Sequence, residues 1–240
     1  MRNQKHTQIS VVQARNVSYS LRRHYLDAFH FRHVAILPAG SLVLDLGGNR
    51  TGKRGLFDVE KYDLKVVYAN LSISKRPHLQ AEAAWLPLRG EGFDAVICSE
   101  LLEHVPDPIA VVKETHRVLR VGGILLVCVP FLTRIHGDPF DFGRYTDYYW
   151  SETLKEAGFI DITIEHQGRF WSVLVDMLRD LAYLNENRSV PRNAMLRRLI
   201  SRAMAKAKQK AVEWDSSAGH GKFSVPEGYA TGFGIRATKA

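Results

Sequence analysis

The sequence predicts an α/β domain built on a doubly wound, mostly parallel sheet. Short apolar runs alternate with amphipathic segments through residues 41–167, and this alternation is typical of right-handed β-α-β crossovers. The first run, Leu42 to Leu46, leads into Gly47 and Gly48, which favour a tight turn at a strand end. Two later runs, 94–99 and 123–129, have the length of buried central strands.

The remaining elements follow from spacing and from turn residues. Helical spacing before Pro38-Ala39-Gly40 predicts a helix within the first forty residues. Asp107 and Pro108 suit the first turn of the next helix, and Gly158 suits the end of another. The expected strands are 41–46, 64–69, a short piece near 78–82, 94–99, 123–129, 160–166 and 229–238, and the expected helices after the first are 108–119, 151–157, 169–185 and 192–214.

Composition indicates one globular domain with an appended piece. The chain has 240 residues, of which 45% are hydrophobic and 24% charged, so it can bury a substantial core. The two cysteines lie in apolar runs, which favours buried free thiols over a disulfide framework. Apolar runs are shorter than the roughly 18 residues that span a bilayer, and the first ten residues do not resemble a signal peptide. We therefore expect a cytoplasmic protein.

The net charge of +8 is concentrated in two flanks. Residues 1–33 carry six Lys and Arg against one acid, and residues 186–213 carry eight against two, whereas the block between them has more acids than bases. A basic flank can attract nucleic acid or anionic lipid, or it can be a solvated helix face. The charge alone leaves both interpretations open.

Three sequence blocks, taken in order, resemble the class I S-adenosylmethionine-dependent methyltransferases, and within them the type 11 family. They are Leu42-Val43-Leu44-Asp45-Leu46-Gly47-Gly48, the run from Phe93 to Val105, and the run from Arg117 to Val127. A dinucleotide-binding fold is the alternative, but residues 47–52 lack the Gly-x-Gly-x-x-Gly spacing. The resemblance implies a seven-stranded Rossmann-like sheet whose last strand is antiparallel. It also implies a methyltransferase domain at 41–240 after a helical flank at 1–40, with a helical insertion at about 169–228.

The same resemblance implies an S-adenosylmethionine site at the carboxyl ends of the strands. Asp45, Gly47 and Gly48 would form the turn under the cofactor, and Glu100 would lie near its methyl group. Two residues depart from the family pattern: Asn49 replaces a glycine, at a position where asparagine tolerates positive φ, and Asn70 replaces the acid that binds ribose. Glu82 matches the acid that faces the adenine amino group, and Ala83 would flank the ring. A domain without activity is the alternative that these departures leave open.

The acceptor side of such a site would be the loop after the fifth strand. Its His136, Asp141, Arg144 and Thr146 resemble the His-x-x-Pro-x-Asp-x-x-Arg-Tyr-Thr segment of the same relatives, with Gly137-Asp138 between the His and the Pro. Imidazole titrates near neutral pH, so His136 is the candidate general base for a hydroxyl acceptor. Arg144 could orient an anionic group, with Asp141 as the third candidate catalytic residue. Alternatively, Asp141 and Arg144 pair to hold the loop, and Thr146 caps a helix.

Other histidines and acids carry weaker signals. Glu103-His104 has ligand-type side chains, but adjacent residues chelate poorly and the sequence offers no third ligand, so we expect no metal site. We expect His24, His30 and His33 to be surface or packing residues.

The predicted insertion contains an apolar helical stripe and a basic helix. Its apolar stripe, Phe170, Trp171, Leu174, Met177, Leu178 and Leu181, fits a packing helix, a dimer contact or a lid over the acceptor. The basic helix 192–214 could lie on an anionic membrane. We expect methyl transfer to a small-molecule or glycan acceptor, at oxygen, with an inactive binding module or an RNA-directed enzyme as alternatives. Nucleic acid is the less favoured partner because no RNA-binding module is visible, and the oligomeric state stays open.

Overall fold

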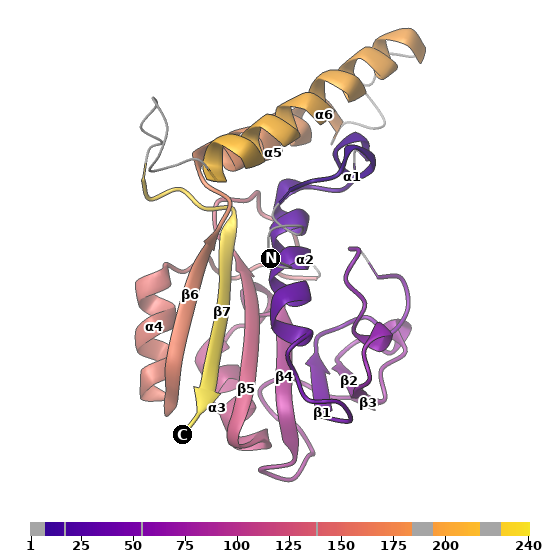
Figure 1. The fold of residues 1–240 in the computed structure, drawn as a ribbon. Helices are drawn as coiled ribbons and strands as arrows, with labels where there is room; N and C mark the ends of the chain where they lie inside the picture. Colours follow the sequence, from indigo (N-terminus) through magenta and orange to yellow (C-terminus); the bar gives the residue numbers. More distant parts are fainter. Residues whose placement is uncertain (1–7, 17, 54, 138, 184–193, 217–226) are drawn as a thin grey trace.

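The protein folds around a seven-stranded mixed sheet, as seen in a computed structural model that describes residues 8–16, 18–53, 55–137, 139–183, 194–216 and 227–240 (Figure 1). Within these residues the strand order is β3-β2-β1-β4-β5-β7-β6. The strands are β1 (Leu42–Leu46), β2 (Lys65–Asn70), β3 (Leu79–Gln80), β4 (Phe93–Ser99), β5 (Leu119–Pro130), β6 (Phe159–Gln167) and β7 (Gly232–Lys239). Strand β7 is antiparallel to both β5 and β6, and this confirms the predicted fold class.

Six α-helices and three short 3-10 turns surround the described sheet. The helices are α1 (Val11–Arg15), α2 (Leu21–Val34), α3 (Pro108–Val118), α4 (Asp147–Glu156), α5 (Phe170–Tyr183) and α6 (Ala194–Ser216), and the turns are η1 (Val59–Lys61), η2 (Ile73–Lys75) and η3 (Leu102–His104). The helix predicted at 151–157 starts earlier than expected, because α4 begins at Asp147. The first two residues of the predicted helix 192–214 lie outside the described residues.

The alternation of side chains along the central strands creates one core on each face of the sheet. Val96 and Cys98 of β4 pack on one side with α3 and α4, whereas Ala95 and Ile97 pack on the other side with α2. Figure 1 shows α2 crossing the face of the sheet opposite α3 and α4. The continuous apolar runs in the sequence are therefore strands buried on both faces.

A third core joins the N-terminal segment to the insertion. It contains Ile9, Ala14 and Leu21 from the N-terminal side and Val175 and Val212 from α5 and α6. Asp176 of α5 accepts hydrogen bonds from the backbone amides of Leu21 and Arg22, so α5 caps the start of α2. In Figure 1, α5 and α6 lie across one end of the sheet, above the N-terminal half of α2.

Helix boundaries follow the expected capping chemistry. The Asp107 carboxylate accepts from the Ala110 amide at 2.9 Å, and Thr146 Oγ1 accepts from the Tyr149 amide at 3.3 Å. Gly158 follows α4 with φ of +92°, a conformation that favours glycine. These three sequence predictions are confirmed.

The buried face of α6 combines apolar and charged side chains. Ala205, Lys208, Ala211, Val212 and Asp215 are buried, whereas Leu199, Ala203 and Trp214 are exposed. Lys208 is buried because its Nζ donates to the Asn16 and Tyr19 carbonyls at 2.9 and 2.7 Å. Asp215 accepts from three backbone amides at the start of α5. These two hydrogen-bonded charged side chains and the apolar residues beside them together set the rotation of the helix.

Candidate functional site

The turn after β1 brings the backbone close to a carboxylate. Gly47 has φ of +80°, and a Cβ at Gly48 would lie 2.2 Å from the Asp45 carboxyl group. Glycine is thus required at both positions, for conformation at one and for space at the other. Asn49 does not have positive φ, so the turn forms without needing the tolerance of asparagine for that conformation.

Asp45 lies at the carboxyl end of β1 and lines the pocket described below. Burial raises the pKa of its carboxyl to about 7, against the opposing charge of Lys53. A cationic group placed in the pocket would favour the ionised form of Asp45. The site is therefore suited to a ligand that carries an ammonium group.

Asn70 supports the glycine turn from the adjacent strand. Its Nδ2 donates to the Gly47 and Gly48 carbonyls at 2.8 and 3.1 Å, and its Oδ1 accepts from the Ser72 amide at 2.9 Å. A carboxylate could not donate to these two carbonyls, and its charge would lie against their oxygens. The amide at this position thus has a structural reason, and a direct role in binding ribose stays a prediction.

The predicted adenine-side residues lie outside the pocket lining. Glu82 is exposed, and Ala83 is half-buried against the core of the sheet. Neither residue lines the pocket that Asp45 and the glycines enter. Their assignment to a cofactor remains a prediction from the resemblance.

Glu100 forms a buried ion pair with α2. Arg22 Nη2 lies 2.5 Å from Glu100 Oε1, and Arg22 Nη1 also donates to Gln167 of β6. Burial alone would raise the pKa of Glu100, but Arg22 and the nearby Arg23 hold it below its usual value. Glu100 adopts φ of +53°, which is uncommon for a residue other than glycine, so the backbone is strained where the strand enters the site.

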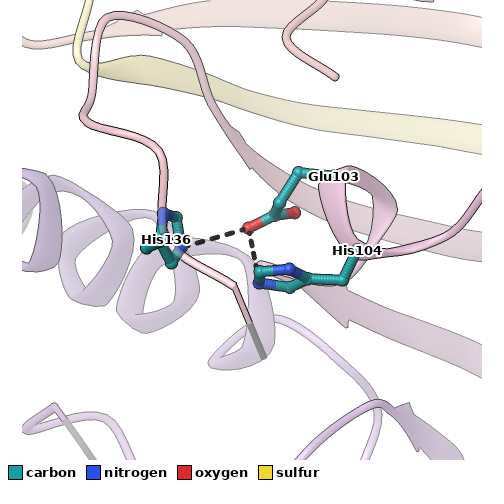
Figure 2. Close-up of side chains that lie close together, drawn as sticks. All are labelled: Glu103, His104 and His136. Atoms are coloured by element: carbon teal, nitrogen blue, oxygen red, sulfur yellow. Dashed lines mark ion pairs between the residues drawn. The ribbon is translucent and has the colours of Figure 1, made fainter. Parts of the chain in front are cut away.

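Glu103, three residues further on, forms no ion pair with an arginine or lysine among the described residues. Only 2% of its side chain is exposed, and neither carboxylate oxygen makes a hydrogen bond to another described residue. Two imidazole nitrogens lie within 4.0 Å of Glu103 Oε1, namely His104 Nε2 at 3.5 Å and His136 Nε2 at 4.0 Å (Figure 2). Burial, together with the charge of Glu100, raises the pKa of Glu103 to about 8.

The loop after β5 is held by an ion pair between Asp141 and Arg144. Arg144 donates to both carboxylate oxygens of Asp141, and these bonds lower the pKa of Asp141 to about 2. The same carboxylate accepts from the His136 backbone amide at 2.8 Å. The pair therefore fixes the backbone that carries His136. Asp138, the other acid of this loop, lies outside the described residues.

One pocket joins the glycine turn to this loop. Its lining includes Asp45, Gly47, Gly48 and Asn49 at one end and Glu100, His104 and His136 at the other. These residues come from the carboxyl ends of β1 and β4 and from the loop after β5, which is where ligands bind in open α/β sheets. The structure thus brings His136 and most of the predicted turn residues together.

Helix α2 also contributes to this pocket, which the sequence did not predict. Arg23, Asp27 and His30 line it, and they follow one another at helical spacing. His30 is buried, and its Nε2 lies 2.7 Å from Ser99 Oγ. Burial lowers the pKa of His30 to about 3, so this imidazole is neutral. A polar stripe on a helix that otherwise packs on the sheet was the available signal.

Comparison with known proteins identifies a methyltransferase domain in the chain. Residues 53–127 match the family described as "Methyltransferase domain". Together with the strand order of the sheet, this match supports a class I S-adenosylmethionine-dependent methyltransferase. The matching family is the type 11 group that the sequence motifs indicated.

Individual relatives align over part of their length. The chain is 34% identical over 131 residues to a ubiquinone biosynthesis O-methyltransferase of Psychrobacter arcticus, covering 48% of this chain and 49% of that protein. It is 31% identical over 99 residues to a chloroplastic 2-methyl-6-phytyl-1,4-hydroquinone methyltransferase of Oryza sativa subsp. japonica, covering 39% and 28%. The chain thus spans less than half of the length of these curated relatives.

A solved structure shares the fold. Phosphoethanolamine N-methyltransferase 2 of Haemonchus contortus, in complex with phosphomonomethylethanolamine and S-adenosylhomocysteine, superposes with a TM-score of 0.56 at 14% identity. The superposition covers 89% of this chain and 52% of that one. At this identity the likeness concerns the fold.

Arg22→Met should destabilise the protein by about 3 kcal/mol or more, because Glu100 would be left as a buried charge without its cation. The double variant Arg22→Met/Glu100→Gln should recover part of that loss. Arg32→Met is a matched control on the same helix, since the Arg32–Glu165 pair is more exposed and should contribute less than about 1 kcal/mol. Urea unfolding measures all three, and equal losses for Arg22 and Arg32 would contradict the assignment.

Proposed function

We propose that this protein transfers a methyl group from S-adenosylmethionine to a hydroxyl oxygen of a small-molecule or glycan acceptor. The observation that carries the proposal is the single pocket that reaches from Asp45 and the glycine turn to His136. A methyl donor at one end and an acceptor at the other would meet beside Glu100. Methyl transfer is an in-line displacement, so such alignment supplies much of its rate.

The residues at the turn fit the cofactor. Glycine at position 48 keeps the space beside the Asp45 carboxyl free of a side chain. Burial disfavours the ionised form of this carboxyl, and an ammonium group beside it would offset that effect. Bound S-adenosylmethionine would supply an electrophilic methyl group on a sulfonium. In this proposal Asp45 holds the amino group of the cofactor, and the backbone at Gly47 and Gly48 lies against its chain.

His136 is the proposed general base of the reaction. Its ring lies at the acceptor end of the pocket, and the Asp141 carboxylate holds its backbone amide in place. A neutral imidazole can accept the proton that an acceptor hydroxyl loses as the new bond forms. Asp141 and Arg144 then act as positioning residues for the loop.

The acceptor class is supported by two observations. One curated relative is named as a methyltransferase of a phytyl-substituted hydroquinone, and the other as an O-methyltransferase of ubiquinone biosynthesis. In this chain α5, near the acceptor loop, exposes the apolar residues Met177, Leu178 and Leu181, and Arg134 of that loop lies 3.5 Å from Asp180 of α5. An acceptor with an apolar portion fits this surface, and a glycan remains the alternative in the same proposal.

Contact of the neighbouring helix α6 with an anionic membrane is a proposed partner interaction. Helix α6 packs on α5 and exposes Arg198, Arg202, Lys206 and Lys210. Cations beside apolar side chains are the pattern of helices that lie at a lipid interface. None of the described helices is long and apolar enough to cross a bilayer.

Calorimetric titration with S-adenosylhomocysteine should show saturable binding that Asp45→Asn weakens about tenfold or more at pH 7.5, because a charge-assisted hydrogen bond is lost. Asp63→Asn, an exposed acid elsewhere, should leave the affinity unchanged. For the natural chain the affinity should fall as the pH drops from 7.5 to 5.5, since Asp45, with a pKa of about 7, becomes protonated. The same pH dependence in Asp45→Asn would contradict this role.

His136→Ala should lower turnover of a hydroxyl acceptor by about a hundredfold or more while the affinity for S-adenosylhomocysteine changes little. His166→Ala is the control, because His166 pairs with Asp147 outside the pocket. Single-turnover assays and calorimetry give the two quantities. Equal loss of both would show that His136 serves folding.

Vesicles of phosphatidylcholine with phosphatidylglycerol should co-sediment with the protein at low salt, and vesicles of phosphatidylcholine alone should do so weakly. Arg198→Glu/Arg202→Glu should abolish the difference, since both cations are exposed on α6. Added salt should have the same effect because it screens exposed charges. Absence of binding at low salt would end the membrane proposal.

A further inference from the structure

Three ligand-type side chains converge at the acceptor end of the pocket. The carboxylate of Glu103 and the rings of His104 and His136 offer ligand atoms that all lie within 4.8 Å of one another. Figure 2 shows both rings facing the same Glu103 oxygen, one from η3 and one from the loop after β5. The sequence offered only the adjacent Glu103-His104 pair, and the fold supplies the third residue from 32 positions further on.

In both imidazoles Nε2 faces Glu103, and the second ring nitrogen, Nδ1, lies close to a backbone carbonyl. His104 Nδ1 lies 2.6 Å from the Phe140 carbonyl oxygen, and His136 Nδ1 lies 3.2 Å from that of Arg134. A carbonyl accepts only from the protonated nitrogen, so each Nε2 keeps its lone pair toward Glu103. The Arg144 guanidinium is further from His136 Nδ1, at 3.4 Å, and Asp141 already neutralises it. Metal-binding histidines usually donate such a hydrogen bond from the ring nitrogen that does not bind the metal.

The charge balance of the site favours a cation at this point. Glu100 is paired with Arg22, and Asp141 is paired with Arg144. Glu103 is 2% exposed, yet neither of its oxygens makes a hydrogen bond to another described residue. A buried carboxyl without a partner loses its proton only at a cost, and a divalent cation between Glu103 and the two imidazoles would offset that cost.

We propose that Glu103, His104 and His136 bind one divalent transition-metal ion, of the Zn²⁺ or Co²⁺ type, at the acceptor end of the pocket. Two imidazoles and one carboxylate suit these ions better than Mg²⁺, which prefers oxygen ligands. Ligand atoms around a tetrahedral Zn²⁺ lie about 3.4 Å apart, given metal–ligand distances near 2.1 Å. The observed Oε1–Nε2 separations of 3.5 and 4.0 Å come close to this value.

The site would have a role in the reaction, and this part of the inference rests on the proposed function. Three protein ligands leave a coordination position for the acceptor oxygen. A metal-bound hydroxyl loses its proton to water more readily. The oxygen lone pair would then form the bond to the methyl carbon as the sulfur–carbon bond breaks and its electron pair returns to sulfur. Where the metal is bound, the Nε2 lone pair of His136 is taken up by it, so water replaces His136 as the group that accepts the proton.

Metal binding can be tested without any methyl acceptor. The untagged full-length chain, freed of metal with a chelator, is titrated with Zn²⁺ by calorimetry and with Co²⁺ by visible absorption. We expect one ion per chain, with Glu103→Gln and His136→Ala each weakening the affinity at least tenfold. His166→Ala is the control and should bind as the unaltered chain does.

The outcomes separate this inference from the proposed function. Binding of S-adenosylhomocysteine is measured on the same samples, and it should persist in Glu103→Gln, which keeps the shape of the side chain. Thermal unfolding shows whether each variant is folded, and Glu103→Gln decides the result if an alanine variant is not. Absence of stoichiometric Zn²⁺ and Co²⁺ binding, or binding that Glu103→Gln leaves unchanged, would overturn the metal site while leaving the cofactor site as it stands.

Discussion

The buried ion pair between Arg22 and Glu100 organises the whole site. Arg22 lies on the first full turn of α2, so the pair fixes this helix to the carboxyl end of β4. The same guanidinium donates to Gln167 of β6, and the backbone amide of Arg22 donates to Asp176 of α5. One residue thus links the N-terminal segment, the sheet and the insertion. Removing one partner of such a buried pair is costly because the other is left as an uncompensated buried charge.

The same pair also determines which acid in the site remains available. Arg22 neutralises Glu100 and not the neighbouring Glu103. The basic side chains within 4.0 Å of the Glu103 carboxyl are therefore the imidazoles of His104 and His136. Strain accompanies this arrangement, since Glu100 has positive φ at the point where β4 ends. Unusual backbone conformations and buried acids tend to gather at functional sites. Both lie here on one short stretch of chain.

Much of the fold could be predicted from the sequence because its signals are local. Buried strands such as 94–99, the capping residues Asp107 and Thr146 and the turn at Gly158 each depend on neighbours within a few residues. The family motif extended this to the strand order, which no local signal contains. The burial of Lys208 on α6 could not be predicted in this way, because its contacts are to carbonyls nearly 200 residues away.

The candidate site was harder to predict for the same reason. Asp45 and the glycine pair follow from the turn after β1, but the role of Asn70 depends on where its amide meets that turn. His136 was chosen from its loop, whereas its proximity to Glu103 required the folded chain. The pocket-lining residues of α2, such as His30, looked like packing residues because their partners lie on β4.

A crystal structure of the complex with S-adenosylhomocysteine would show whether one pocket serves both the methyl donor and its acceptor. We expect the amino group of the ligand on Asp45, its chain over Gly47 and Gly48, and its sulfur beside Glu100 on the side that faces His136. A ligand bound away from the glycine turn would contradict this expectation. So would a sulfur separated from His136 by protein.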